Sequence, residues 1–280
     1  MDRTEPGHRQ ARLRSTPQRE VGPLLREWRQ RRKLSQLTLA LDVGVSPRHL
    51  SFVETGRSRP SAELLLSMSE HLALPLRERN DLLLAAGYAP RYSETPLESP
   101  DLQAVRSALQ RLLAAHDPYP GVALDRHWNV VLANRATERL MGLLPPHLVG
   151  PPLNMMRASL HPEGFAAATL NFDAWGRHLL HELERARDAA DDPALAALAA
   201  EVAGYPNVAA LLATATRRPT YQESLLIPCV LLSGEGRALS LFTTQATFGS
   251  PRDITLAELT VELFYPADAA TEDALRAQAI

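Results

Sequence analysis

Residues 35–60 contain two short helical patterns separated by a tight turn, and this stretch constrains the fold more than any other part of the chain. Ser35 and Ser46 each stand where a side-chain oxygen can accept a backbone N–H bond at a helix start. Pro47 follows in the first helical turn, where a missing N–H costs nothing. Gly44 can end the first helix because glycine adopts the left-handed conformation without steric cost. The pattern predicts a helix-turn-helix.

The apolar residues predict an inner and an outer face for both helices. Leu37, Ala40 and Leu41 recur at helical spacing and are predicted to form the buried face of the first helix. Leu50 and Val53 are predicted to face inward from the second. The side chains left facing outward are Pro47, Arg48, His49, Ser51 and Phe52. A polar helix face followed by a basic loop is typical of a helix that enters the major groove of DNA.

The residues from Leu24 to Tyr88 resemble the Cro/C1-type (XRE, phage-repressor-like) helix-turn-helix domain, a five-helix bundle. The resemblance rests on Ser-Gln-x-x-Leu-Ala at 35–40, Gly-Val-Ser at 44–46 and Glu-x-Gly-Arg-x-x-Pro-Ser at 54–61. It implies a double-stranded DNA operator as partner, and Glu54 is interpreted as a structural residue that ties the recognition helix to its neighbours. The implied DNA-binding residues are Ser35, Gln36, Ser46, Pro47, Arg48, His49, Ser51, Phe52, Thr55, Arg57 and Arg59.

Within this set, Gln36 is predicted to bond a phosphate, and Thr55, Arg57 and Arg59 match the phosphate-contacting loop. Pro47 departs from the family, because many relatives have a polar base-reading side chain there; contact with a thymine methyl group is the expectation instead. The alternative is a small helical bundle that serves only protein contacts.

Charge is distributed unevenly along the chain. Residues 1–92 carry 16 Arg and Lys against 10 Asp and Glu, and the remainder carries 14 against 22, which gives +6 and −8 and sums to the net charge of −2. A basic amino-terminal third beside an acidic remainder is expected of a DNA-binding module joined to another domain. Residues 1–20 are predicted to be a disordered basic tail, which is either an arm that seeks phosphates or a solvated tail without a role.

The length of 280 residues suffices for two domains. The predicted fold class is multidomain, α and α+β, with an amino-terminal five-helix bundle and a carboxy-terminal PAS-like antiparallel sheet with helices. The predicted divisions are the tail at 1–20, the helix-turn-helix domain at 21–90, a linker and connector helix at 91–116, and the PAS-like domain at 117–280.

The last of these segments alternates between strand and helix patterns. A hairpin is predicted within 119–134, with Asn134 capping the helix that follows. Further helices are predicted at 171–187, 193–202 and from 207. Strands are predicted at 221–232, 238–248 and 256–264, with a Gly-Glu-Gly turn at 234–236. Cys229 is the one cysteine, so no internal disulfide can form, and it is interpreted as a packing residue.

This segment is similar to the carboxy-terminal domain of MmyB-like regulators. The similarity rests on the motifs at 125–131, 134–136, 151–157, 247–249, 253–259 and 264–268. It implies a PAS-like ligand-binding module, with long-chain fatty acids as the ligand class. No other cofactor is expected.

A fatty-acid site needs an apolar tunnel with a few polar groups at its mouth. The candidate lining residues are Met155, Met156, Phe165, Leu170, Phe172, Trp175 and Leu179, and the candidate carboxylate partners are Arg157, Arg177, His178 and His181. The alternative is plain core packing for the first set and a solvated helix face for the second.

No catalytic or metal site is predicted. His178 and His181 are three apart on a helix, whereas the metalloprotease helix has two histidines four apart with a glutamate between them. There is no nucleophile elbow, phosphate loop or dinucleotide-binding glycine motif. The chain is therefore not expected to be an enzyme.

The sequence as a whole predicts a one-component transcription regulator that binds a pseudo-palindromic operator as a homodimer and senses a small apolar ligand. Because it has neither a long apolar span nor a signal-peptide core, it is expected to be cytoplasmic and not inserted in a membrane. The main rival is a regulator whose carboxy-terminal domain serves only dimerisation, and a weaker one makes that domain an enzyme.

Overall fold

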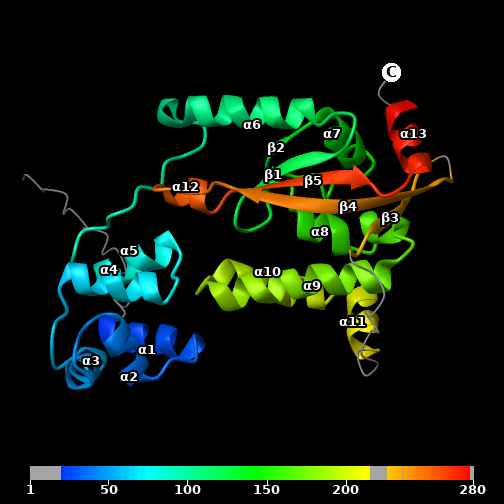
Figure 1. Ribbon diagram of the computed structural model, residues 1–280. Coiled ribbons are helices and arrows are strands. Elements are labelled where there is room, and N and C mark those ends of the chain that lie inside the picture. Colours follow the sequence, from blue (N-terminus) through cyan, green and yellow to red (C-terminus); the bar gives the residue numbers. More distant parts are fainter. Residues whose placement is uncertain (1–19, 215–225, 235, 278–280) are drawn as a thin grey trace, which may run out of the picture. The chain divides into compact units, whose positions relative to one another are not determined.

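The computed structural model describes residues 20–214, 226–234 and 236–277, and these divide into two units at Arg91 and Tyr92. The first unit is helical, as Figure 1 shows. Its helices are α1 (Val21–Arg31), α2 (Gln36–Asp42), α3 (Pro47–Glu54), α4 (Ala62–His71) and α5 (Leu76–Ala85). The predicted five-helix bundle with a helix-turn-helix is thus confirmed.

Side-chain caps and glycines set the ends of these helices. Ser35 Oγ accepts the N–H of Thr38 at the start of α2, and Ser46 Oγ accepts the N–H of His49 at the start of α3. After α2 and α3, Gly44 and Gly56 have φ of 70° and 72°, the left-handed region that glycine reaches most easily. These local signals fix both helices of the motif, as predicted.

The core of the first unit gathers residues from all five helices. Leu39, Ala40, Leu50 and Val53 are completely buried in it. The prediction that Leu37 and Leu41 are buried with Ala40 is wrong, because they are 55% and 68% exposed. Leucine occupies positions 37, 39 and 41, so more than one face of this helix satisfies an apolar helical pattern. Ala40 is buried beside Leu39, which turns Leu37 and Leu41 outward.

The second unit is built on a five-stranded antiparallel sheet with strand order β2-β1-β5-β4-β3. The strands are β1 (Gly121–Leu124), β2 (Val130–Ala133), β3 (Cys229–Leu232), β4 (Ala238–Thr247) and β5 (Thr260–Pro266). The predicted hairpin is β1 and β2. Of the strand predicted at 221–232, residues 221–225 lie outside the described part of the chain, as do Glu235 of the predicted turn and residues 1–19 of the predicted tail.

Helices cover both faces of this sheet (Figure 1). α6 (Gln103–Ala115) follows a short 3-10 turn, η1 (Pro100–Leu102), and places Leu109 and Leu113 against Ala123 and Val261 of the sheet. The other helices near the sheet are α7 (Arg135–Met141), α8 (Met155–Leu160), η2 (Phe165–Ala168), α9 (Phe172–Ala189) and α13 (Ala269–Ala277). Helices α10 (Pro193–Ala203) and α11 (Pro206–Ala213) pack instead against α8 and α9.

The strand predicted at 256–264 begins later than expected. Residues Ile254–Ala257 form the short helix α12, and β5 starts only at Thr260. Asp253 causes the difference because its side chain accepts the N–H groups of Thr255 and Leu256 and so caps a helical turn.

Asp253 also attaches the segment before α6 to the second unit. Its carboxylate accepts hydrogen bonds from Ser93 Oγ at 2.8 Å and from Thr95 Oγ1 at 2.7 Å. Leu97 and Leu102 are buried in the same core as α6. The segment from Tyr92 to Ala115 therefore packs into the second unit.

Candidate nucleic-acid interface and ligand cavity

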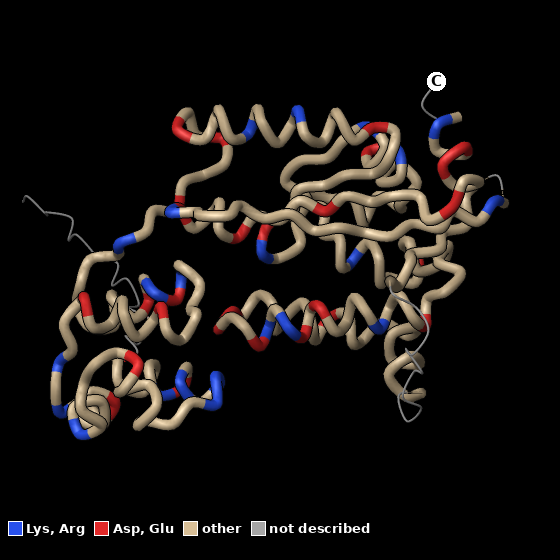
Figure 2. Tube along the Cα trace, in the orientation of Figure 1, with Lys and Arg blue, Asp and Glu red and all other residues tan. Residues whose placement is uncertain are grey.

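The recognition helix α3 has a completely buried side and an accessible side. Leu50 and Val53 fix it in the bundle, whereas Pro47 and Arg48 are exposed and His49 is half-buried. Figure 2 shows basic residues in the part of the chain that comprises α3 and the connection from α3 to α4. This is the arrangement that a DNA-reading helix with flanking phosphate contacts requires.

Phe52 lies between two of the predicted DNA-binding arginines. The guanidinium carbon of Arg48 is 5.3 Å from the centre of its ring, and that of Arg57 is 6.0 Å from it. The backbone N–H of Arg57 also bonds the Phe52 carbonyl oxygen at 2.8 Å across Gly56. Cation–π attraction to this one ring therefore holds the arginine predicted to read a base near the arginine predicted to contact a phosphate. The sequence pattern does not predict that Arg48 and Arg57 contact the same ring.

Glu54 forms the centre of a buried polar network under α3. Its carboxylate accepts two hydrogen bonds from Arg29, Nε to Oε1 at 2.6 Å and Nη2 to Oε2 at 2.9 Å. Gln36 Nε2 donates to the same carboxylate at 2.7 Å. The hydrogen bonds that Arg29 donates to the Glu54 carboxylate raise the pKa of Arg29 above its ordinary value. The structural role predicted for Glu54 is confirmed, and Gln36, predicted to bond a phosphate, is held in place by it.

Arg59 and Thr55 of the predicted phosphate-contacting loop have partners within the bundle. Arg59 donates from Nε and Nη2 to the carbonyl oxygen of Ala86 and lies over the ring of Tyr88. Thr55 Oγ1 donates to the Ser51 carbonyl oxygen at 2.7 Å. Arg57 is the exposed arginine of this loop that also packs on Phe52. The DNA contacts of the predicted residues themselves stay predictions.

The second unit encloses an apolar cavity of about 50 Å³ between the sheet and helices α7, α8 and α9. Its lining residues are Pro120, Val122, Thr137, Leu140, Met141, Met155, Ser159, Phe165, Thr169, Trp175, Cys229, Leu231, Leu241 and Phe264. No charged side chain is among them. The cavity thus offers apolar surface with a few hydroxyl groups, which suits an apolar ligand.

Three of the predicted ligand-binding residues, Met155, Phe165 and Trp175, line this cavity. Met156, Phe172 and Leu179 lie instead in the neighbouring core formed with α10 and α11. Leu170 is 57% exposed. The sheet residues on the lining were missed because strands alternate their faces, and which face meets the helices depends on the tertiary packing.

The predicted carboxylate partners lie outside the lining. Arg157 forms a double hydrogen bond with Glu201, with both N···O distances 2.7 Å, and Arg177 donates to the Leu211 carbonyl oxygen at 2.9 Å. His178 packs against Trp175 with ring centres 5.2 Å apart, and burial lowers its pKa. His181 is exposed. The structure does not bring these four side chains together at the cavity.

Two acidic groups, the buried Cys229 thiol and the half-buried Glu262 carboxyl, lie on or near the cavity wall. Burial raises the pKa of the Cys229 thiol to about 12, which keeps it protonated and makes it a packing residue of the wall. Burial also raises the pKa of Glu262 to about 7. Glu262 is two residues from Phe264 in β5, so both side chains point to the same face of the sheet.

The motif at 125–131 forms the turn between β1 and β2. Asp125 Oδ1 accepts the N–H groups of His127 and Asn129, and Trp128 takes a φ of 62°. Asn154, the cap of α8, donates to the Asn129 side chain at 3.0 Å. These residues therefore have a structural role, which is to fasten the hairpin to the start of α8.

Comparison with known families assigns both units. The model of the MmyB-like transcription regulator ligand binding domain matches residues 105–277, and a helix-turn-helix model matches residues 25–79. The chain belongs to the MmyB-like transcription regulators. The resemblances to this family and to XRE-type helix-turn-helix domains are thus confirmed, and the structure has the predicted fold class, a five-helix bundle followed by an antiparallel sheet with helices. This regulator binds DNA through its first unit, and its second is a ligand-binding domain.

Solved structures give similarities over parts of this regulator. The clp gene regulator ClgR from Corynebacterium glutamicum is 32% identical, with a TM-score of 0.22, over 35% of this chain and 90% of its own. The PAS domain of BvgS from Bordetella pertussis is 16% identical, with a TM-score of 0.27, over 63% of this chain and 96% of its own. An RNA-binding Light-Oxygen-Voltage receptor is 13% identical, with a TM-score of 0.27, over 92% of this chain and 62% of its own. No curated protein matched significantly.

Among the described residues, no single helix is long and apolar enough to cross a membrane.

Proposed function

We propose that this regulator is a cytoplasmic one-component sensor that binds a pseudo-palindromic operator as a homodimer and whose DNA affinity changes when an apolar, fatty-acid-like ligand enters the second unit. In this proposal the protein is not an enzyme, and the ligand favours one placement of the two DNA-binding heads over another. Operator half-sites about one helical turn apart match such a dimer. The observation that carries the ligand part is the apolar cavity, enclosed by residues of the sheet and helices.

The size of the cavity sets a requirement for ligand entry. Ligand pockets have volumes of roughly 300–1,000 Å³, several times the 50 Å³ enclosed here. A long acyl chain therefore needs the wall to open. Met141 and Met155 on this wall have flexible side chains that can repack around such a chain. Mass spectrometry of an organic extract from the denatured protein tests the proposal, and a single acyl species near one per chain supports it.

Removing the Arg57 guanidinium is expected to weaken binding to all DNA sequences alike, because phosphate contacts carry no base information. Arg57→Ala should lower affinity and reduce the slope of log K against log salt by about 1. Arg48→Ala should instead relax the preference at one base position, at a cost of about 1–3 kcal/mol against the correct base. Fluorescence anisotropy over a salt series and a library of operator variants measures both effects.

Arg111→Ala is the matched control, because Arg111 is an exposed arginine on α6 in the other unit. It should leave both the affinity and the salt slope unchanged. An Arg57→Ala protein with the wild-type salt slope contradicts the phosphate role.

Filling the cavity is expected to abolish ligand binding and its effect on DNA. Met141→Trp places a large ring where the wall must accept the ligand, so the amount of co-purified acyl species should fall at least about tenfold, consistent with overpacking of a closed site. Leu143→Trp is the control two residues away, since Leu143 is 74% exposed and does not line the cavity. Equal ligand content in the two variants contradicts this location for the site.

The alternative is a second unit that serves only dimerisation, with its cavity permanently closed. It is favoured if the extract contains no small molecule and added fatty acids change neither thermal stability nor DNA affinity. A ligand that binds only the folded protein must raise stability by RT ln(1 + [L]/Kd). The sensor hypothesis therefore predicts that added fatty acid raises the melting temperature, and the dimerisation hypothesis predicts no change.

A further inference from the structure

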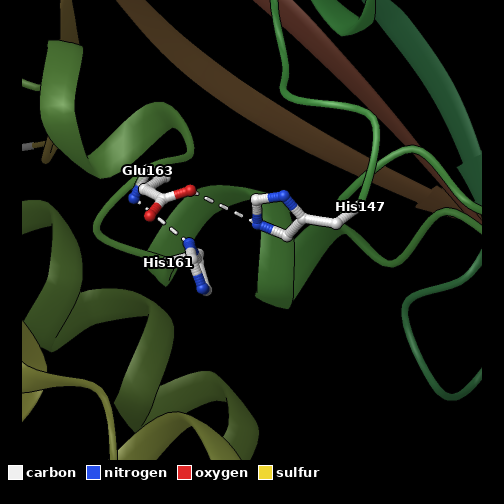
Figure 3. A group of neighbouring side chains, drawn as sticks. All are labelled: His147, His161 and Glu163. Atoms are coloured by element: carbon white, nitrogen blue, oxygen red, sulfur yellow. Dashed lines mark hydrogen bonds and ion pairs between the residues drawn. The ribbon is translucent and has the colours of Figure 1, made fainter.

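Two loops of the second unit bring three metal-binding side chains together (Figure 3). His147 lies between α7 and α8, His161 directly follows α8, and Glu163 is two residues further on. One ligand atom from each of the three residues lies within 4.8 Å of the other two. His147 Nε2 is 3.6 Å from Glu163 Oε2. The histidines are fourteen positions apart in the sequence, so the group forms only through the fold.

The single in-plane lone pair of the neutral His161 ring lies at Nδ1, the nitrogen on the Glu163 side of the ring. Its Nδ1 accepts the backbone N–H of Glu163 at 3.1 Å, which assigns the proton of a neutral ring to Nε2. Figure 3 shows this nitrogen on the side of the ring that faces Glu163. A metal ion needs an unprotonated imidazole nitrogen. His161 Nδ1 can supply it when the metal replaces the backbone N–H of Glu163 as the partner of this nitrogen.

The backbone around the three residues is held in place by packing. Leu148 beside His147 and Phe165 near Glu163 belong to one small apolar core with Ala158. Gly164 passes so close to this core that an added Cβ would be 2.2 Å from the Ala158 carbonyl oxygen. The loops are thus fixed against one another, which lowers the entropy cost of gathering ligands.

The ring of His161 also packs against Tyr205, whose own position is fixed by hydrogen bonding. It contacts the Tyr205 ring edge-to-face with centres 4.9 Å apart. Tyr205 in turn donates a hydrogen bond to Glu201, which is paired with Arg157. His161 is therefore half-buried and held by its neighbours. The His147 and Glu163 side chains are 52% and 68% exposed, so they can change conformation to reach a metal ion.

We propose that His147, His161 and Glu163 bind a first-row divalent transition-metal ion such as Zn²⁺. Two imidazoles and one carboxylate suit these ions, whereas Mg²⁺ and Ca²⁺ prefer oxygen ligands alone. Metal–ligand bonds of about 2.0–2.2 Å place ligand atoms roughly 3.3 Å apart, so the group must contract by at most about 1.5 Å, which its exposed side chains allow. Water completes the coordination. The site is separate from the apolar cavity, and none of its three residues lines that cavity.

The test uses Co²⁺ as a spectroscopic probe and Zn²⁺ in calorimetry. The full chain, without a histidine tag and treated with chelator, is titrated at pH 7.5. One ion per chain is expected, with visible d–d absorption from Co²⁺. His147→Ala, His161→Ala and Glu163→Gln should each lower affinity at least about tenfold, the size of effect that disturbed metal sites show.

His181→Ala is the matched control, because His181 is an exposed histidine three positions from His178 on α9. It should bind metal as the wild type does. The proposal is wrong if the wild type takes up no Co²⁺ at 100-fold molar excess, if the three variants bind like the wild type, or if His181→Ala alone abolishes uptake. If His161→Ala does not fold, the metal affinities of His147→Ala and Glu163→Gln, which change exposed side chains, test the proposal. Neither ligand nor operator is present, so the result is independent of the proposed sensor function.

Discussion

Replacing Glu54 by leucine is expected to destabilise the DNA-binding unit by about 3–5 kcal/mol, the cost of leaving one charge of a buried pair without its partner. Glu54 is 4% exposed and Arg29 is 8% exposed. Removing the carboxylate leaves the Arg29 guanidinium in the interior, where the Leu34 carbonyl oxygen, 2.7 Å from Nη1, is the acceptor that remains among the described residues. Gln36 loses its acceptor as well.

The double variant Arg29→Met, Glu54→Leu distinguishes two causes of the lost stability, the unpaired Arg29 charge and the altered packing. Replacing both members of a buried pair by apolar residues is often close to neutral, so it should recover more than about half of the stability lost in Glu54→Leu. Hydrogen exchange of residues 21–86 under native conditions is the suitable measurement, because a single denaturation curve averages over the two units. A double variant as unstable as Glu54→Leu would show that packing, not the unpaired charge, accounts for the loss.

This network also explains how a structural residue affects DNA binding. Glu54 is the last residue of α3, and its partners come from α1 and the start of α2. The carboxylate thus fixes the recognition helix relative to the helix that carries Gln36. We therefore expect loss of operator affinity in Glu54→Leu to exceed what its unfolded fraction alone explains.

Short-range signals in the sequence predicted most of the first unit. Ser35, Ser46 and Gly44 act within one helical turn, so their residue types alone indicate where helices begin and end. The burial of Leu37 and Leu41 was predicted wrongly because burial depends on which side of a short helix meets the bundle. That choice is made by tertiary contacts, which spacing does not record.

The second unit shows the same division between local and tertiary information. Asn134 was predicted as a helix cap, and it accepts the N–H of Thr137 as expected. The cavity wall, in contrast, combines Val122, Cys229 and Phe264 from three strands that meet only in the sheet. His178 and His181 are the histidine pair that local spacing singles out, because they lie three positions apart on one helix. His147 and His161 lie on separate loops, and no local pattern relates them.

Raising the pH from 5 to 8 is expected to weaken the second unit through Glu262. Burial is the main cause of its raised pKa of about 7, against an ordinary value of 4.5, and the negative charge of Glu182 on α9 adds to it. Hydrogen bonds from Gln245 and Thr243 of β4 act in the opposite direction. The folded state therefore holds the proton more tightly than the unfolded state does.

The sign follows from this difference in proton affinity. The stabilising contribution of protonated Glu262 is fully present below about pH 4.5 and is lost as the pH rises through 7. A difference of about 2.5 pKa units corresponds to roughly 3 kcal/mol. Glu262→Gln keeps the shape without the charge, so it should be more stable than the wild type by about this amount at pH 8 and by less than about 1 kcal/mol at pH 5.

Comparison of the two proteins at each pH isolates this carboxyl group. His178, whose pKa is lowered by burial, contributes stability that increases as the pH rises toward 6.5, and it does so equally in wild type and variant. Asp192 and Asp253, whose pKa values are lowered, lose their contributions only at more acidic pH. Glu184→Gln, at an exposed position of α9, provides a control that should follow the wild type throughout. Hydrogen exchange of β4 and β5 amides at pH 5 and pH 8, corrected for intrinsic rates, gives the measurement. A constant difference between Glu262→Gln and wild type across this range would mean that Glu262 is ionised in the folded sheet at pH 5, and burial would then not control its protonation.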